Sequence, residues 1–144
     1  MLILYYCNQS VDHVRHLSPE QNLEFTRSVI EMLDDWGLQD SEQIALLGLP
    51  DDTRSRQIRK FRSDTPLPDE EIVNERVEHL VGIADALRTS YPTNAMGGSM
   101  WMNRRNSRFQ DRTPLQAMLE DGIQGIVAVR IHLDCAYDWH ANGN

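Results

Sequence analysis

Five potential metal ligands occur within nine positions near the C-terminus, and they are the residues with the most evident capacity for chemistry. They are His132, Asp134, Cys135, Asp138 and His140. The spacing of His132 and Cys135 would place both on one face of a helix. Zinc sites normally combine two separated pairs of ligands, and the sequence offers no second pair. We therefore interpret these residues as part of the surface and core, and we expect no metal.

Motifs typical of enzymes are also missing from the sequence. It contains no glycine-rich phosphate loop, no nucleophile elbow and no H-E-x-x-H motif. The acidic clusters Asp51-Asp52 and Asp69-Glu70-Glu71 precede predicted helices, and carboxylates there stabilise the positive end of a helix dipole. The sequence thus predicts neither an enzyme nor a bound cofactor, and it favours a protein that acts by binding.

Positive charge is concentrated in two tracts, although the 144-residue chain has a net charge of −8. The first tract contains Arg54, Arg56, Arg59, Lys60 and Arg62, and the second contains Arg104, Arg105, Arg108 and Arg112. An acidic protein is a poor general binder of nucleic acid. Each basic tract therefore calls for a specific explanation.

The composition indicates a globular protein of one domain, or of two small subdomains that share a core. Apolar residues make up 40% of the chain, enough to form a core, and charged residues make up an ordinary 25%. Two cysteines without a C-x-x-C motif predict no disulfide framework, so we expect a cytoplasmic protein. No apolar run reaches the roughly 18 residues of a membrane span. The apolar start, Met1 to Cys7, is too short for a signal peptide; a strand, a docking arm or a frayed tail remain open there.

Three helices are predicted in the N-terminal half. Ser18-Pro19-Glu20-Gln21 forms a capping box with proline at the first helical position, and Gly37 ends that helix. Asp40 and Gln43 form a second cap pair, before a short helix that ends at Gly48. A third helix is predicted from a cap at Asp51 or Asp52 to about Arg62.

The second and third of these helices have the proportions of a helix-turn-helix motif. In such a motif the third helix enters the major groove of DNA. Around this helix, Ile58, Phe61 and the stem of Arg54 face inward, whereas Arg56, Arg59, Lys60 and Ser63 lie opposite. The outward arginines could contact guanine edges or phosphates. A solvated basic helix without a DNA role explains the same pattern. The predicted DNA-binding residues are Arg54, Arg56, Arg59, Lys60 and Ser63.

The C-terminal half is predicted to be helical as well, after breaks at Pro66 and Pro68. A long helix runs from near Asp69 to Tyr91-Pro92, and residues 93–111 are expected to be irregular. Thr113-Pro114-Leu115-Gln116 is another capping box, and Gly122 separates its short helix from a strongly apolar one over about 123–137. The predicted fold is all-α, with a helix-turn-helix subdomain over 18–65 and a second helical subdomain over 69–140.

The stretch from about Glu75 to Asp134 resembles the toxin-binding domain of Xre/MbcA/ParS-type antitoxins. The matching features include the Trp101-x-Asn103 turn, Asn106, Arg112-Thr113-Pro114-Leu115, Met118-Leu119, Gly122 and Val127-x-x-Arg130-x-x-Leu133. The segment from Leu23 to Phe61 is weakly similar to the helix-turn-helix half of such antitoxins. One departure is clear: Gln110-Asp111 stands where a small or glycine pair usually precedes the Arg-Thr-Pro run.

The resemblance implies an antitoxin that neutralises a RES-domain toxin, an enzyme that acts on NAD, by covering its active site. It also implies that the N-terminal helix-turn-helix binds operator DNA, often as a dimer. The predicted toxin-binding residues are Trp101, Asn103, Arg104, Arg105, Arg108, Arg112, Arg130 and Trp139. Arginine and tryptophan are frequent interface anchors, and the excess of apolar residues on the last helix indicates an interface.

Structural roles compete with these assignments. Trp101 could belong partly to the core, and Thr113-Pro114 could serve only to start a helix. Arg112 and Arg130 could pair with nearby carboxylates such as Glu120 or Asp121. Two rival functions also remain: a stand-alone helix-turn-helix regulator whose C-terminal half dimerises, and a dimeric adaptor without a DNA role.

Overall fold

A computed structural model describes residues 17–142, and the regular secondary structure in this part of the chain is helical. The α-helices are α3 (Pro19–Asp35), α4 (Asp40–Leu47), α5 (Ser55–Ser63), α6 (Glu71–Ser90), α7 (Gly97–Met102), α8 (Pro114–Asp121) and α9 (Ile123–Asn142), with a 3₁₀ turn, η1, at Ser107–Phe109. The described residues form no strand, and their one extended pairing is an isolated bridge between Asn106 and Arg112. The predicted all-α fold is confirmed. The segment Met1 to Cys7 lies outside the described residues.

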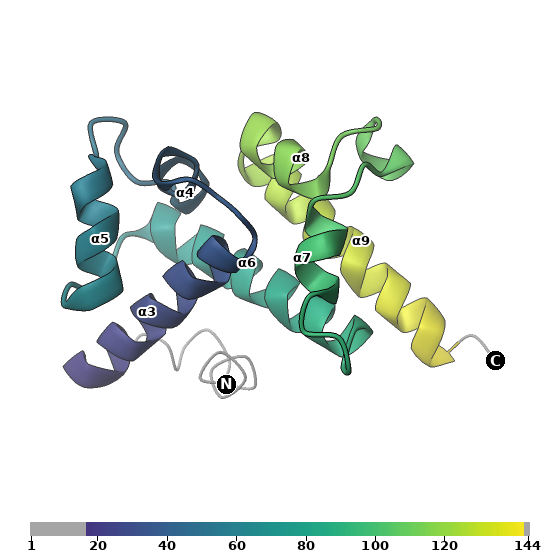
Figure 1. The fold of residues 1–144 in the computed structure, drawn as a ribbon, viewed down its shortest axis with the longest axis horizontal. Coiled ribbons are helices and arrows are strands. Elements are labelled where there is room, and N and C mark those ends of the chain that lie inside the picture. Colours follow the sequence, from purple (N-terminus) through teal and green to yellow (C-terminus); the bar gives the residue numbers. More distant parts are fainter. Residues whose placement is uncertain (1–16, 143–144) are drawn as a thin grey trace.

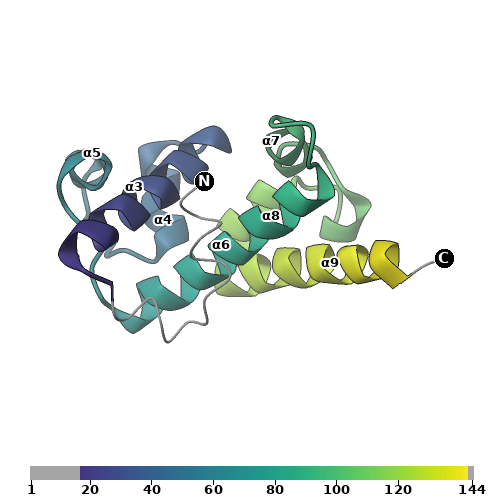
Figure 2. The same cartoon turned by 90° about the horizontal axis from the view of Figure 1, so that it is seen from below.

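The helices gather at two ends of the long helix α6. Figure 1 shows α3, α4 and α5 on one side and α7, α8 and α9 on the other, with α6 passing between them. In Figure 2, α7 lies at one edge of the molecule and α9 runs along the opposite edge. The most extensive contacts are those of α6 with α9, α8 with α9, and α3 with α5. Helix α6 is therefore common to both halves.

One continuous cluster of buried side chains joins the two halves. Helix α3 contributes Val29, Ile30 and Leu33. Along α6, Val73, Val77, Leu80 and Leu87 are buried and Ala84 is half-buried. On the C-terminal side the cluster includes Met102, Leu115, Met118, Ile126, Val129 and Leu133. Because α6 packs against both groups of helices, its burial stabilises both at once.

Arg76 of α6 contacts both halves of the protein. Its Nη1 donates to the carbonyl oxygens of Ala45 and Leu46 at 3.5 and 3.4 Å, at the C-terminal end of α4. A cation there interacts favourably with the negative end of the helix dipole and with carbonyls that lack helical partners. The side chain of Arg76 also lies close to Gly48 and Gly122. It therefore links the end of α4 to the turn between α8 and α9.

Several helix boundaries agree with the prediction. The capping boxes of Ser18 with Gln21 and of Thr113 with Gln116 are both formed. Gly37 and Gly48 follow the ends of α3 and α4 as predicted, and both have a left-handed backbone, with φ of 85° and 72°. Helix α9 begins at Ile123 as predicted and continues to Asn142, beyond the predicted end near residue 137.

Other boundaries were predicted wrongly. Helix α4 is capped by Gln39, whose N–H donates to Glu42, because Asp40 pairs with Arg62 and Gln43 is buried. Helix α5 begins after Arg54 without a side-chain cap, since Asp51 and Asp52 lie in a turn in which Thr53 N–H donates to Pro50.

The two remaining differences lie in the C-terminal half. Helix α6 begins at Glu71, two residues after the predicted start, and Asp69 accepts a hydrogen bond from the Asn74 side chain. Residues 93–111 contain α7 and η1 rather than only irregular chain. Met96 precedes α7 without making a side-chain cap, so the start of this helix carries no cap signal in the sequence.

Candidate interaction surfaces

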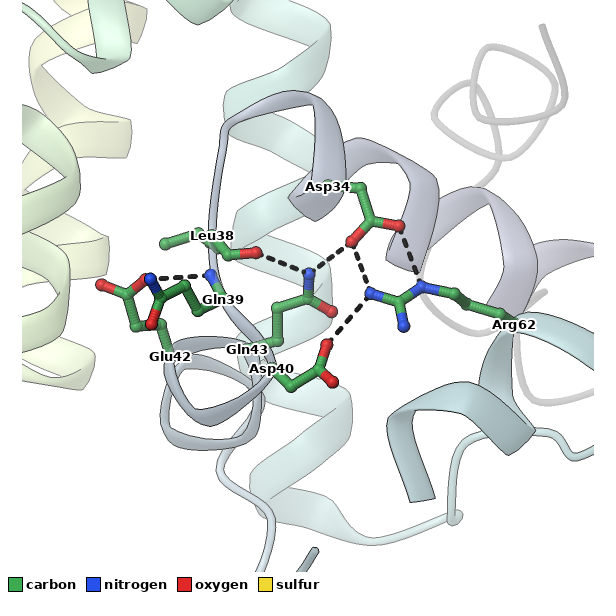
Figure 3. Close-up of polar contacts among 7 residues, drawn as sticks. All are labelled: Asp34, Leu38, Gln39, Asp40, Glu42, Gln43 and Arg62. Atoms are coloured by element: carbon green, nitrogen blue, oxygen red, sulfur yellow. Dashed lines mark hydrogen bonds and ion pairs between the residues drawn. The ribbon is translucent and has the colours of Figure 1, made fainter. Parts of the chain in front are cut away.

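A polar cluster fixes α5 against α3 and α4 (Figure 3). Arg62, near the end of α5, donates to both carboxylate oxygens of Asp34 at 3.0 and 2.7 Å, and to Asp40 at 3.1 Å. Gln43, which is fully buried, donates to Asp34 at 2.6 Å and to the Leu38 carbonyl at 3.1 Å. Asp34 thereby accepts bonds from both neighbouring helices. This arrangement determines how α5 is oriented on the rest of the protein.

The electrostatics of the cluster follow from these bonds. The hydrogen bond from Arg62 holds the pKa of Asp34 below its usual value, and partial burial opposes this effect. The carboxylates of Asp34 and Asp40 raise the pKa of Arg62 in turn. The Gln43 side-chain oxygen has no hydrogen-bond partner among the described residues.

The remaining cations of the first basic tract face solvent. Arg54, Arg56, Arg59 and Lys60 are exposed, and their side chains make no hydrogen bond or ion pair with the part of the chain that the structure describes. Ile58 and Phe61 are buried on the opposite face, as predicted. Arg54 is the residue that precedes the first turn of α5, and it is exposed.

Ser63, the last predicted DNA-binding residue, is held at the end of α5. Its carbonyl oxygen accepts hydrogen bonds from the Arg27 guanidinium on α3. Its hydroxyl lies 3.4 Å from the Lys60 carbonyl oxygen and from the Asp64 carboxylate. The exposed hydroxyl therefore has local partners, unlike the four cations before it.

Asn106 organises the loop of the second basic tract. Its N–H donates to the Arg112 carbonyl, its side chain accepts from Arg108 N–H at 3.0 Å, and its carbonyl accepts from Asp111 N–H. Gln110 and Asp111 have φ of 60° and 59°, and no other non-glycine residues in the described chain have positive φ. These are the two residues that replace the family's small or glycine pair. The loop keeps a backbone that glycine adopts most easily.

Arg112 closes this loop onto α8. Its guanidinium donates to Glu120 at 2.9 Å, to Asp121 at 2.9 and 3.1 Å, and to the Phe109 carbonyl at 3.0 Å. The hydrogen bonds from Arg112 lower the pKa of Asp121, and the two carboxylates raise the pKa of Arg112. The carboxylate pairing anticipated from the sequence is confirmed for Arg112.

Trp101 takes part in an aromatic cluster beneath the same loop. Its ring is stacked on His132 of α9 with centroids 6.0 Å apart, and it meets Phe109 edge-on at 6.3 Å. Trp101 is half-buried and packs against the core. Burial lowers the pKa of His132, and the nearby charge of Arg108 contributes in the same direction. No group of three metal-ligand residues forms a site within the described chain.

Arg130 lies between α9 and α6. Its Nη1 is 3.0 Å from His79 Nδ1, and its Nε is 3.9 Å from Asp134. A methyl group added at Gly82 would come within 2.8 Å of the guanidinium, so the absence of a side chain there makes room for Arg130. The residue thus contacts its own helix and its neighbour, while 30% of its side chain stays exposed.

The other predicted toxin-binding residues divide into two groups. Asn103 has a structural contact, because its amide donates to the Trp36 carbonyl at 3.1 Å and to the Ser99 carbonyl at 2.8 Å. Arg104, Arg105 and Arg108 are exposed, and their side chains have no hydrogen bond or ion pair with the described residues. The side chain of Trp139 lies outside the described part of the structure.

The sequence of this C-terminal region matches a known protein family. Residues 86–135 match the model of the antitoxin Xre/MbcA/ParS C-terminal toxin-binding domain. This part of the chain is therefore similar to a toxin-binding domain of the antitoxin type. The matched region comprises the end of α6, α7, the arginine-containing loop, α8 and most of α9.

A longer similarity extends beyond this domain. Uncharacterized protein y4oB of Sinorhizobium fredii is 32% identical over 101 residues, which is 70% of this chain and 74% of the relative. The chain belongs to the same family as that protein.

Two features of these candidate interaction surfaces were not predicted from the sequence. The Asp34–Arg62 contact joins residues that are far apart in the chain, and no local pattern predicts it. Tyr91, Met96 and Met100 are exposed apolar residues, and both methionines belong to the segment that was expected to be irregular. The spacing of four between Met96 and Met100 was the available signal.

Proposed function

We propose that this protein is the antitoxin of a type II toxin–antitoxin system and acts by binding, without catalysis. The observation that supports the proposal most strongly is the match of residues 86–135 to an antitoxin toxin-binding domain. In this proposal the C-terminal subdomain, residues 69–140, neutralises its toxin by covering the toxin's active site. The toxin is encoded in the same operon, and the complex forms in the cytoplasm.

The proposed toxin is a RES-domain enzyme that consumes NAD, as the family resemblance implies. A site for NAD must accommodate a phosphate-bearing dinucleotide and therefore favours cationic or polar groups. A chain with a net charge of −8 is electrostatically suited to approach such a site. Once docked, its arginine loop would contact other parts of the toxin surface, since like charges repel within the cationic site.

The described geometry supports distinct roles for the predicted toxin-binding residues. Arg104, Arg105 and Arg108 are free to contact a partner. Arg112 and Asn103 hold the backbone that presents them, and Trp101 supports the loop from beneath. Arg130 contacts His79 of α6 and Asp134 of α9, and its partly exposed side chain can also contact a partner.

Co-expression with the protein encoded beside it tests the proposal. We expect the neighbour alone to arrest growth and deplete cellular NAD, and co-expression of this chain to restore both. The two proteins should also co-purify as a stable complex. A non-toxic neighbour that forms no complex would contradict the antitoxin proposal, and a toxic neighbour that leaves NAD unchanged would contradict the RES assignment alone.

We further propose that residues 18–65 form a helix-turn-helix unit that binds operator DNA and represses the operon. The specific observation behind it is the exposed basic face of α5, with Arg56, Arg59 and Lys60 unpaired among the described residues. One copy offers few phosphate contacts, so we propose a homodimer that places two α5 helices on neighbouring half-sites.

Changing Arg56, Arg59 and Lys60 together to alanine separates the functions. We expect the variant to lose binding to a DNA fragment from upstream of its gene and to keep toxin neutralisation. The wild-type affinity for that fragment should fall steeply with salt, with a slope that loses about one unit per removed phosphate contact. Loss of neutralisation in the same variant would favour the stand-alone regulator, and wild-type protein without salt-dependent DNA binding would favour the dimeric adaptor.

A further inference from the structure

The exposed apolar side chains are unevenly distributed over the protein. Within the described residues, the large hydrophobic side chains that stay exposed are Ile72, Tyr91, Met96, Met100 and Ile131. All but Ile72 fall within the matched toxin-binding domain. Three of them lie between residues 91 and 100, where α6 ends and α7 begins.

Met96 and Met100 form the centre of this surface. Met100 N–H donates to the Met96 carbonyl at 2.9 Å, which is the bond of one helical turn, so both side chains leave the same side of α7. They are 63% and 53% exposed, although the adjacent Gly97 and Met102 are buried. Figure 2 shows that α7 lies at an edge of the molecule. The methionines are therefore accessible to a partner.

Two cations follow shortly after the end of α7. Arg104 is four residues after Met100 in the sequence, and its N–H donates to the Trp101 carbonyl. Arg104 and Arg105 are exposed and have no ion pair with the described residues, in a chain of net charge −8. Unpaired arginines in an acidic protein are complementary to carboxylates of another molecule.

We propose that Met96 and Met100, flanked by Arg104 and Arg105, form the contact surface for the toxin, and that the toxin presents an apolar patch bordered by carboxylates. This inference rests on the proposed antitoxin function and specifies the chemistry of the partner. Methionine suits the role because its flexible thioether adapts to an irregular surface. Trp101, by contrast, is stacked on His132 and supports the loop from within.

Contacts with neighbouring segments hold α7 in place. Ser99 donates to the Asp35 carbonyl at 2.8 Å, and Asn103 donates to the Trp36 carbonyl at 3.1 Å, so both tie α7 to the end of α3. Gly97 and Gly98 lie close to Tyr91 and Leu87 of the preceding segment. A helix of six residues is thus held in place from two sides, and its methionines can contact a partner at a smaller entropic cost.

The decisive experiment measures affinity for the co-expressed neighbour with the variant Met96→Ser/Met100→Ser. We expect the dissociation constant to rise at least about tenfold, and growth rescue to fail at low expression. The matched control is Ile72→Ser, which removes a side chain of similar exposure, 60%, outside the matched domain. Circular dichroism shows whether each variant is folded.

Charge reversal tests the carboxylate border. Arg104→Glu/Arg105→Glu should weaken toxin binding at least about tenfold, while Arg56→Glu/Arg59→Glu, on α5, should leave it unchanged. Unchanged affinity of the methionine variant would overturn the inference, as would a methionine variant that only converts a dimer to a monomer. Loss of DNA binding with intact toxin binding in the Arg104/Arg105 variant would equally overturn it. If the wild-type chain does not bind the neighbour, the proposed function fails first, and that outcome is distinct from the others.

Discussion

The two basic tracts share one arrangement and differ in how it is built. In each, the last arginine pairs with two carboxylates of the protein while the preceding ones stay exposed. Arg62 binds Asp34 and Asp40, which lie 28 and 22 positions away in the chain. Arg112 binds Glu120 and Asp121, only eight and nine positions away. The first contact assembles three helices, and the second closes a single loop onto the next helix.

The exposed cations of the two tracts are therefore positioned by different kinds of contact. The cations of α5 stand on a regular helix whose orientation depends on long-range pairing. The arginines of the loop stand on a backbone with two left-handed residues, and its shape depends on local bonds to Asn106 and α8. We therefore expect damage to the helix packing and damage to the loop to affect different binding activities.

The largest effect is expected where α8 and α9 cross. A Cβ atom at Gly125 would lie 2.2 Å from the Ala117 carbonyl oxygen, so Gly125→Ala must push the two helices apart. We expect a loss of about 3 kcal/mol in the free energy of unfolding, measured by urea denaturation, together with loss of toxin binding.

Gly37→Ala is the matched control in the N-terminal half. Nothing lies within 4 Å of its added methyl group, so only the left-handed backbone, with φ of 85°, is strained. The expected cost is about 1 kcal/mol. Equal losses for the two variants would show that the close approach of α8 and α9 contributes nothing specific.

Replacing Arg62 and Arg112 one at a time should affect different binding activities. Arg62→Met keeps the length of the stem and removes the bonds to Asp34 and Asp40. Because these partners are about one-third exposed, we expect a loss of about 1 kcal/mol in unfolding free energy. DNA affinity should fall because α5 is no longer held in one orientation, and toxin affinity should be unchanged.

Arg112→Met should give the opposite pattern. The loop loses its bonds to Glu120 and Asp121, so toxin affinity should fall while DNA affinity is retained. The melting temperature should decrease slightly, since the carboxylate partners are largely exposed. Titration of both variants against a DNA fragment and against the toxin checks the pair. If each variant lost both activities equally, the two regions would not be independent.

Acid should weaken the C-terminal half before the N-terminal half. Burial lowers the pKa of His132, so the unfolded chain binds a proton more readily than the folded one. The stability contributed by neutral His132 is present above its unfolded pKa of about 6.5 and is lost as pH falls below it.

Asp34, whose pKa is also lowered in the folded state, should respond only in more acidic solution. Its contribution is present above the unfolded carboxyl pKa of about 3.9 and is lost as pH falls toward the lower folded value. Unfolding free energies measured between pH 7.5 and 3 check both steps. His132→Gln should flatten the upper step, Asp34→Asn the lower one, and an unchanged profile in either variant would contradict the assignment.

The smallest expected effect is an increase in stability. Gln110 has φ of 60° and is exposed, so Gln110→Gly removes backbone strain without removing a buried contact. The gain should be about 0.5 kcal/mol, because the greater freedom of glycine in the unfolded chain offsets part of it. Thermal melts against Gln116→Gly provide the control, since that change places glycine in α8, removes the hydrogen bond from Thr113 N–H and should destabilise.

Local features of the fold were predictable because their causes lie within a few residues. The capping boxes at Ser18 and Thr113 and the helix end at Gly48 need only neighbours three or four positions away. The pairing of Arg112 with Glu120 and Asp121, eight and nine positions away, was one of the two roles that the sequence left open for this residue. Gln43 was mistaken for a cap residue because its burial depends on Asp34 of another helix.

The proposed toxin-binding surface was harder to predict from the sequence. The match to an antitoxin domain agrees with the resemblance drawn from Arg112-Thr113-Pro114-Leu115 and its neighbours. Residue types singled out Trp101 as an anchor, yet whether a tryptophan faces inward depends on where His132 and Phe109 lie in the fold. Met96 and Met100 were overlooked because methionine is usual in both cores and surfaces.

The sharing of α6 between the two halves constrains how such proteins can diverge. One face of this helix packs with α3 and α4 and another with α9, and Arg76 bonds to the end of α4 beside the α8–α9 turn. Recombination that exchanged whole halves between relatives would bring together mismatched faces of α6. New partner specificity should therefore arise by point substitutions in α7 and its loop, while α6 itself changes slowly.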